Sequence, residues 1–289
     1  MELFLQQIAS GLATGAIYAS LALALVMIFQ STNHINFAQG EMALLSTYFA
    51  WTLLQAGVPY PLAFAATVAV SFAFGYALER VVIRHFHDAP VFALVVVFMG
   101  LFLAFNALAS WIWGFEIKVF DSPVKSLSTG SAILGAHNLF IILVTGLMMA
   151  LVFLFFRFTK LGLAMRAAAL NPTSASLVGI RVGQVLAIGW GLAGALGAVS
   201  GMMVAPIVFL DPNMMLGVLL YSFASAMLGG LNNPLGAVVG GLLFGVLENI
   251  VGTYIIGHEL KLTFALVVVI GILLVKPSGL FGKVAVKRV

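Results

Sequence analysis

Residues 3–29, LFLQQIASGLATGAIYASLALALVMIF, form an unbroken apolar stretch without a charged side chain. About 20 apolar residues in a helix suffice to cross the hydrocarbon core of a bilayer. The stretch is too long for the apolar core of a signal peptide, and Glu2 precedes it where a signal peptide carries basic residues. We therefore expect it to be a retained transmembrane helix.

The remainder of the chain has the same character. Hydrophobic residues make up 63% of the 289 residues and charged residues 8%, against about 45–50% and about 25% in soluble domains. This composition predicts an all-α polytopic membrane protein with a single transmembrane domain over residues 1–289. At about 20 residues per crossing, we predict nine transmembrane helices, with eight and ten as limits, at 3–29, 42–56, 61–84, 90–113, 137–157, 184–209, 214–230, 235–256 and 261–276. The stretches at 42–56 and 214–230 are short enough for a broken or re-entrant helix.

The cations indicate the orientation of this topology. The larger group falls on one side and three lysines fall on the other: Arg80, Arg84, the cations of 157–181, Lys276, Lys283, Lys287 and Arg288 against Lys118, Lys125 and Lys261. Because cytoplasmic loops are enriched in Lys and Arg, we predict a periplasmic N-terminus and a cytoplasmic C-terminus. The cations behind the net charge of +4 thus lie in loops beside apolar stretches, and no basic patch remains that could bind nucleic acid. The absence of cysteine excludes disulfides, thiolate metal sites and thiol catalysis.

A loop at 158–183 contains the signals of two short helices. Asn171 is a preferred N-cap residue, Pro172 fits a first helical position, and Gly179 fits the left-handed conformation that ends a helix. We predict two helices joined by a sharp turn, at about 162–169 and 172–178. The cations in and beside the loop, with no carboxylate among them, place it in the cytoplasm: Arg157, Lys160, Arg166 and Arg181. The alternative is a solvated loop that only marks the cytoplasmic side.

Two segments of the sequence echo each other. Each consists of an apolar stretch, a turn with proline, and a helix with Phe-Gly followed by Glu; the helix motifs are Phe74-Gly75 with Glu79 and Phe244-Gly245 with Glu248. In the predicted topology the two copies cross the membrane in opposite directions, as the inverted repeats of transporters do. Chance similarity between apolar segments is the alternative.

Polar residues within the apolar sequence are candidates for a translocation pathway. Irregular backbone at membrane depth is tolerated only where protein or water satisfies it, and intramembrane carboxylates must face protein or water. The candidates are Asn36, Gln39 and Glu41 before and within one span, Asn232 and Asn233 in a turn, and Glu248 within a late span. For the first three an interfacial loop is an equal alternative, and for Glu248 a structural hydrogen bond to a neighbouring helix is favoured over a proton relay.

The sequence carries no motif of a nucleotide-hydrolysing enzyme. It contains no phosphate-binding loop, no His-Glu-x-x-His and no nucleophile elbow. We therefore expect a chain that is not an enzyme, holds no metal and binds no cofactor. A transporter of this kind uses either an ion gradient or a partner ATPase, and the helical cytoplasmic loop favours the partner.

A set of short motifs extends along the whole chain. They are 11–23 (GLATGAIYASLAL), 35–42 (INFAQGEM), 159–162 (TKLG), 166–167 (RA), 171–172 (NP), 177–180 (LVGI), 229–230 (GG), 234–237 (PLGA) and 276–282 (KPSGLFG). Together they resemble LivH-type permeases, the inner-membrane subunits of ABC importers for branched-chain and other hydrophobic amino acids.

The resemblance implies partners and a coupling role. The partners are a LivM-type permease, two cytoplasmic ATPases that hold ATP and Mg, and a periplasmic amino-acid-binding protein. The loop at 158–183 becomes the element that contacts the ATPases, through Lys160, Gly162, Arg166, Ala167, Asn171, Pro172, Ser174 and Gly179. This chain has Gly162-Leu163 where related loops often carry Gly-Arg, and it lacks their acidic residue.

Other functions stay open at this point. Related permeases transport urea, short amides or other amino acids, so the resemblance does not fix the substrate. A secondary carrier or channel for small solutes is the alternative from another class. The sequence also leaves open whether the second permease is a paralogue or another copy of this chain.

Overall fold

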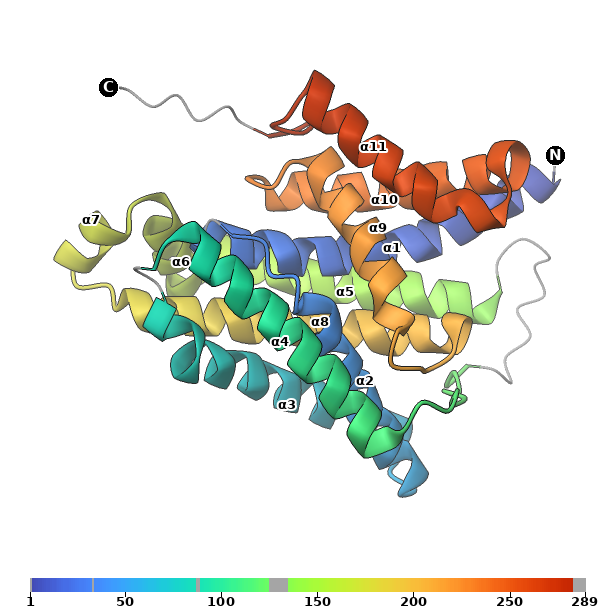
Figure 1. The fold of residues 1–289 in the computed structure, drawn as a ribbon, viewed down its shortest axis with the longest axis horizontal. Helices are drawn as coiled ribbons and strands as arrows, with labels where there is room; N and C mark the ends of the chain where they lie inside the picture. Colours follow the sequence, from blue (N-terminus) through green and yellow to red (C-terminus); the bar gives the residue numbers. More distant parts are fainter. Residues whose placement is uncertain (1, 33, 87–88, 125–134, 283–289) are drawn as a thin grey trace.

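A computed structural model describes residues 2–32, 34–86, 89–124 and 135–282. These residues form a bundle of helices (Figure 1). The helices are α1 Glu2–Thr32, α2 Gln39–Gln55, α3 Tyr60–Val81, η1 Ile83–Phe86, α4 Val91–Trp113, α5 Ala136–Phe158, α6 Lys160–Leu170, α7 Pro172–Leu177, α8 Val182–Val208, α9 Met214–Gly229, α10 Pro234–Val251, η2 Gly252–Ile256, η3 His258–Leu260 and α11 Lys261–Val275. Every predicted transmembrane stretch coincides with a helix, which confirms the all-α class.

Not every one of these helices can cross a membrane unaided. Among the described residues, six are long and apolar enough, at 2–30, 60–86, 91–113, 136–158, 182–208 and 234–256. The helices α2, α9 and α11 have 17, 16 and 15 residues, so each spans at most about 25 Å of a hydrocarbon core about 30 Å thick. The short predicted stretches are thus short helices, and α11 ends within one residue of its predicted end.

Two three-helix units repeat the same plan of a long, a short and a long helix. The first is α1–α2–α3 and the second is α8–α9–α10. Helix α1 packs antiparallel on α10, because Gly11 contacts Gly245 and Ala19 contacts Gly241. The third helix of each unit packs on the first helix of the other unit: α10 packs on α1, and α3 packs on α8.

The Phe-Gly motifs of the sequence repeat occupy equivalent positions in this arrangement. A Cβ on Gly75 of α3 would lie 2.3 Å from the Trp190 carbonyl oxygen of α8, and one on Gly245 of α10 would lie 2.3 Å from Gly15 Cα of α1. Both glycines therefore mark a close approach of the third helix of one unit to the first helix of the other. The two copies of the sequence repeat thus occupy equivalent positions in the fold, and their opposite orientation across the membrane stays a prediction.

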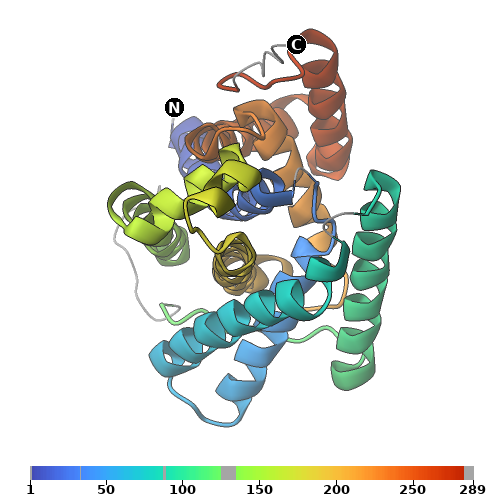
Figure 2. The same cartoon turned by 90° about the vertical axis from the view of Figure 1, so that its left-hand side faces the viewer.

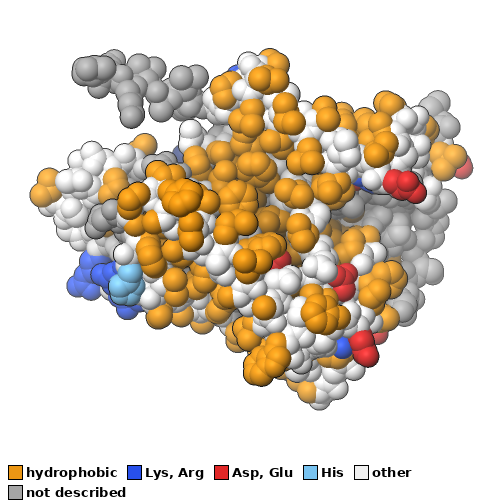
Figure 3. Space-filling view, viewed as in Figure 1, with side chains coloured by type: hydrophobic (Ala, Val, Ile, Leu, Met, Phe, Trp, Pro, Cys, Tyr) orange, Lys and Arg blue, Asp and Glu red, His pale blue; other side chains and the backbone are white. Residues whose placement is uncertain are grey.

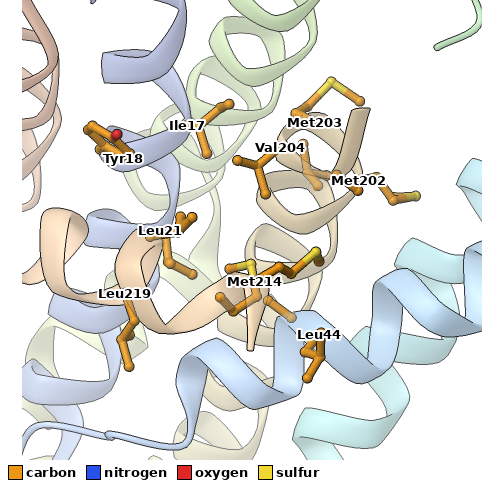
Figure 4. Close-up of a cluster of buried hydrophobic side chains, with 14 of the residues drawn as sticks. Ile17, Tyr18, Leu21, Leu44, Met202, Met203, Val204, Met214 and Leu219 are labelled. Atoms are coloured by element: carbon orange, nitrogen blue, oxygen red, sulfur yellow. The ribbon is translucent and has the colours of Figure 1, made fainter. Parts of the chain in front are cut away.

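The short helices begin inside the bundle. After α1 the chain folds back through residues 34–38, so that α2 starts beside the middle of α8 (Figure 1). After α8 it folds back again, and Gly40 in the first turn of α2 lies against Leu219 of α9. An apolar cluster from α1, α2, α8 and α9 surrounds this meeting point, including Ile17, Leu21, Leu44, Met202, Met203, Met214 and Leu219 (Figure 4).

Candidate functional site

The loop between α5 and α8 forms the two predicted short helices, α6 and α7. Asn171 Oδ1 accepts a hydrogen bond from the Ser174 backbone N–H at 2.9 Å, Pro172 occupies the first turn, and Gly179 ends the segment with a φ of +86°. All three predicted signals are confirmed. The cap of α6 was missed: Thr159 Oγ1 accepts from the Gly162 N–H at 2.9 Å, and a Thr directly before a helix is a common cap.

Small residues hold this loop against the bundle. A Cβ on Gly162 would lie 2.5 Å from the Phe155 carbonyl oxygen at the end of α5. Ala168 and Ala175 pack together with Val185 of α8. Gly162 and Ala168 therefore position α6 on the bundle, and they offer little side chain to a partner.

The outer side of α6 and α7 is exposed at one end of the molecule (Figure 2). The predicted coupling residues on it are Lys160, Arg166, Asn171, Pro172, Ser174 and Gly179, while Ala167 is half-buried and Gly162 is buried. Sequence reasoning missed the apolar part of this surface, in which Leu170, Leu177 and Val178 are 88%, 84% and 77% exposed. Where such exposed apolar side chains form a contiguous patch, they mark a site of protein or membrane interaction.

Three of the candidate pathway residues meet where α2 begins. Asn36, Gln39 and Glu41 are each at most 1% exposed. Asn36 Oδ1 accepts a hydrogen bond from the Ala38 N–H at 3.0 Å, and Gln39 Nε2 donates to the Ala193 carbonyl at 2.9 Å. Asn36 thus braces the turn into α2, and Gln39 connects α2 to the middle of α8. Within the described part of the chain, Gln39 Oε1 has no hydrogen-bond donor.

Asn106 of α4 connects the two short helices at this point. Its Nδ2 donates to the Pro212 carbonyl at 2.8 Å and lies 3.4 Å from Glu41 Oε2. Glu41 belongs to the first turn of α2, and Pro212 lies two residues before the start of α9. The sequence analysis did not select Asn106, although an amide within an apolar span is itself a signal of a functional or packing role.

The structure does not bring Asn232 and Asn233 to this group. They lie in the turn between α9 and α10, where Gln30 Nε2 donates to the Asn232 carbonyl at 3.1 Å and Asn233 Nδ2 donates to the Phe281 carbonyl at 3.1 Å. Gln30 also lines a small cavity beside Arg166 of α6. The turn therefore lies on the side of the bundle that carries α6.

Glu248 also belongs to a different group of residues. Its carboxylate forms an ion pair with Lys261 Nζ at 2.9 Å and lies 3.4 Å from the Tyr18 hydroxyl. Lys261 in turn donates to Asn249 Oδ1 at 3.3 Å. Glu248 thus connects α10 to α1 and α11. The ion pair was not anticipated, because Lys261 lies on another helix and was expected at the outer surface.

Comparison with known proteins places the chain in a family. Residues 7–273 match the family described as the permease component of the branched-chain amino acid transport system. No solved structure matches the chain.

Three relatives illustrate the similarity. The branched-chain amino acid permease LivH of Salmonella typhimurium is 28% identical over 99% of this chain and 98% of its own length. BraD of Pseudomonas aeruginosa, a permease of the same kind, is 30% identical over the same shares. A probable LivH of Methanocaldococcus jannaschii is 30% identical over 91% of this chain and 87% of its own length. The chain belongs to the family of branched-chain amino acid transport permeases.

Proposed function

We propose that this permease is the translocation subunit of an ATP-driven importer for branched-chain or other hydrophobic amino acids. A periplasmic binding protein delivers the substrate, a second LivM-type permease completes the transmembrane part, and two cytoplasmic ATPases supply ATP hydrolysis. The names of the relatives support the substrate class, since those proteins are branched-chain amino acid permeases.

The loop of α6 and α7 is the observation that carries this proposal. Both of its helices begin with capped turns, Gly162 packs α6 against the end of α5, and its outer side exposes Leu170, Leu177 and Val178 as well as Arg166. A rigid loop with exposed apolar side chains suits a partner that must transmit force, whereas a solvated loop needs neither feature. The partner ATPases are expected to contact this surface and to bind ATP and Mg themselves.

The interior of the bundle supports a pathway that holds its substrate weakly. The meeting point of α2 and α9 is surrounded by apolar side chains, and its carboxylate, Glu41, is buried beside Asn106. Glu248 is paired with Lys261, which favours a structural role for this carboxylate over a proton relay. The binding protein is then expected to supply the affinity.

A double variant tests the coupling role. Asn171→Ala removes the α7 cap, which costs about 1 kcal/mol of local helix stability, and Arg166→Glu reverses the charge of the exposed surface. In the complex reconstituted in liposomes, we expect the double variant to lose leucine uptake or ATPase retention while the permease remains inserted. Glu116→Lys, a charge reversal at an exposed residue beyond α4 and away from the loop, is the matched control and should leave ATPase retention unchanged.

Three outcomes would overturn parts of the proposal. Normal uptake with normal ATPase retention in the double variant contradicts the role of the loop. Uptake of urea or short amides without leucine contradicts the substrate class. Uptake driven by a proton gradient without an ATPase makes the chain a secondary carrier.

A further inference from the structure

A cavity of about 120 Å³ lies beside the start of α2. Segment 35–37, α1, α9 and α11 line it. The lining residues are apolar except for Asn36: Leu25, Ile35, Phe37, Leu219, Leu220, Phe223, Ala265, Leu266 and Val269. We call this cavity the α9–α11 pocket.

The pocket adjoins the meeting point of the two short helices. Leu219 lines the pocket and also contacts Gly40 in the first turn of α2. Asn36 and Phe37, two further lining residues, lie three and two residues before the start of α2. The pocket therefore lies next to the first turn of α2.

The size and chemistry of the pocket restrict its occupant. An apolar protein cavity of about 150 Å³ stays dry and binds benzene, and the three- and four-carbon side chains of valine and leucine are smaller than benzene. The apolar walls cannot satisfy an ammonium or carboxylate group, which would be costly to bury there. Asn36 at the edge retains donor capacity, because the acceptor described for its Nδ2 is the weakly accepting Met42 sulfur at 3.7 Å.

We propose that the α9–α11 pocket receives the aliphatic side chain of the transported amino acid during its passage. The charged head group remains outside the pocket, on the side of α2. This inference rests on the proposed function, and it names a subsite that discriminates substrates by the volume of their side chains.

The ratio of leucine to valine uptake tests this subsite. Ala265 is 1% exposed and lines the pocket from α11, so Ala265→Val reduces the space available. In the reconstituted complex with binding protein saturated by either amino acid, we expect the leucine-to-valine ratio of ATP-driven uptake to fall about tenfold, the effect of one methylene in a tight apolar site. Because the readout is a ratio, a uniform loss of folded complex does not change it.

Two further variants complete the design. Gly271→Val adds a side chain on α11 where nothing lies within 4 Å, and it should leave the ratio unchanged. Leu220→Ala enlarges the pocket from α9, and combining it with Ala265→Val should restore the ratio.

Each of the other possible outcomes would overturn either the subsite or the proposed function. An unchanged ratio in Ala265→Val, as expected if a lipid acyl chain fills the pocket, overturns the subsite alone. An equal fall in Gly271→Val, or no restoration in the double variant, also overturns it. Failure of the unmodified complex to transport leucine and valine overturns the proposed function instead.

Discussion

Glycines at the helix crossings are the residues on which the packing of this permease depends most directly. Gly245 allows α10 to approach α1 until backbone touches backbone, whereas a Cβ on Gly100 of α4 would have nothing within 4 Å. The same residue type therefore has opposite consequences at the two positions. At a crossing it permits contact, and on an open helix face it only lowers helix propensity.

Gly245→Ala should destabilise the protein, because the new Cβ would lie 2.3 Å from Gly15 Cα and the helices must separate. We expect the free energy of unfolding to fall by about 1–3 kcal/mol, the range for overpacked cores. Gly100→Ala is the matched control and should be neutral or stabilising by up to about 1 kcal/mol. Unfolding of the purified variants in detergent measures both, and equal effects would contradict the close crossing.

At the scale of elements, α11 is attached to the bundle by a polar group at its first residue. The Lys261 side chain reaches Glu248 of α10 and passes over Gly252, where a Cβ would lie 2.5 Å from Lys261 Cε. Gly252 begins the π-helical segment η2. The ion pair therefore connects two helices across an irregular turn, and it supports the wall that α11 gives to the α9–α11 pocket.

Replacing one partner of this ion pair should lower the free energy of unfolding more than replacing both partners. Lys261→Met leaves a buried carboxylate and should lower the free energy of unfolding by roughly 3 kcal/mol. Glu248→Gln leaves the Lys261 ammonium without its partner, and because the Lys261 side chain is 18% exposed the loss should be smaller. The double variant should lose less free energy of unfolding than the sum of the two single losses, and it should retain ATP-driven uptake. Glu259→Gln, at an exposed residue of the same turn, is the control, and strict additivity would contradict the pairing.

At the scale of the whole molecule, the two ends of the bundle differ in charge. The end that carries α6, α7 and η1 shows the larger group of Lys and Arg side chains, whereas the Asp and Glu side chains visible in this view lie toward the other end (Figure 3). Helix α8 connects these ends over 27 residues, a length of about 40 Å. Ser174 lies before its start and Leu210, which pairs with Lys118, lies after its end.

Cysteine labelling tests the orientation that this asymmetry favours. Because the chain has no cysteine, Ser174→Cys and Glu116→Cys each introduce a single exposed thiol. We expect a membrane-impermeant reagent to label Glu116→Cys from outside intact cells and Ser174→Cys only after the inner surface is opened. Labelling of both from the same side would contradict the topology and the inverted repeat across the membrane.

The sequence by itself determined the features that depend on neighbouring residues. The apolar stretches located the helices, and Asn171, Pro172 and Gly179 located α7, because caps and turns are made within a few residues. The Phe-Gly repeat also pointed to the correct internal symmetry. These signals are local or repeated, so they can be recognised in the sequence before the fold is known.

Only the tertiary structure decided which helices meet. In a membrane nearly every face of a helix is apolar, so hydrophobicity does not reveal which face is buried against protein. The contacts of Asn106 with Glu41 and of Lys261 with Glu248, and the α9–α11 pocket, join residues from separate helices. Likewise, Asn232 resembled Asn36 as a polar residue between spans, and only the path of the chain separated the two.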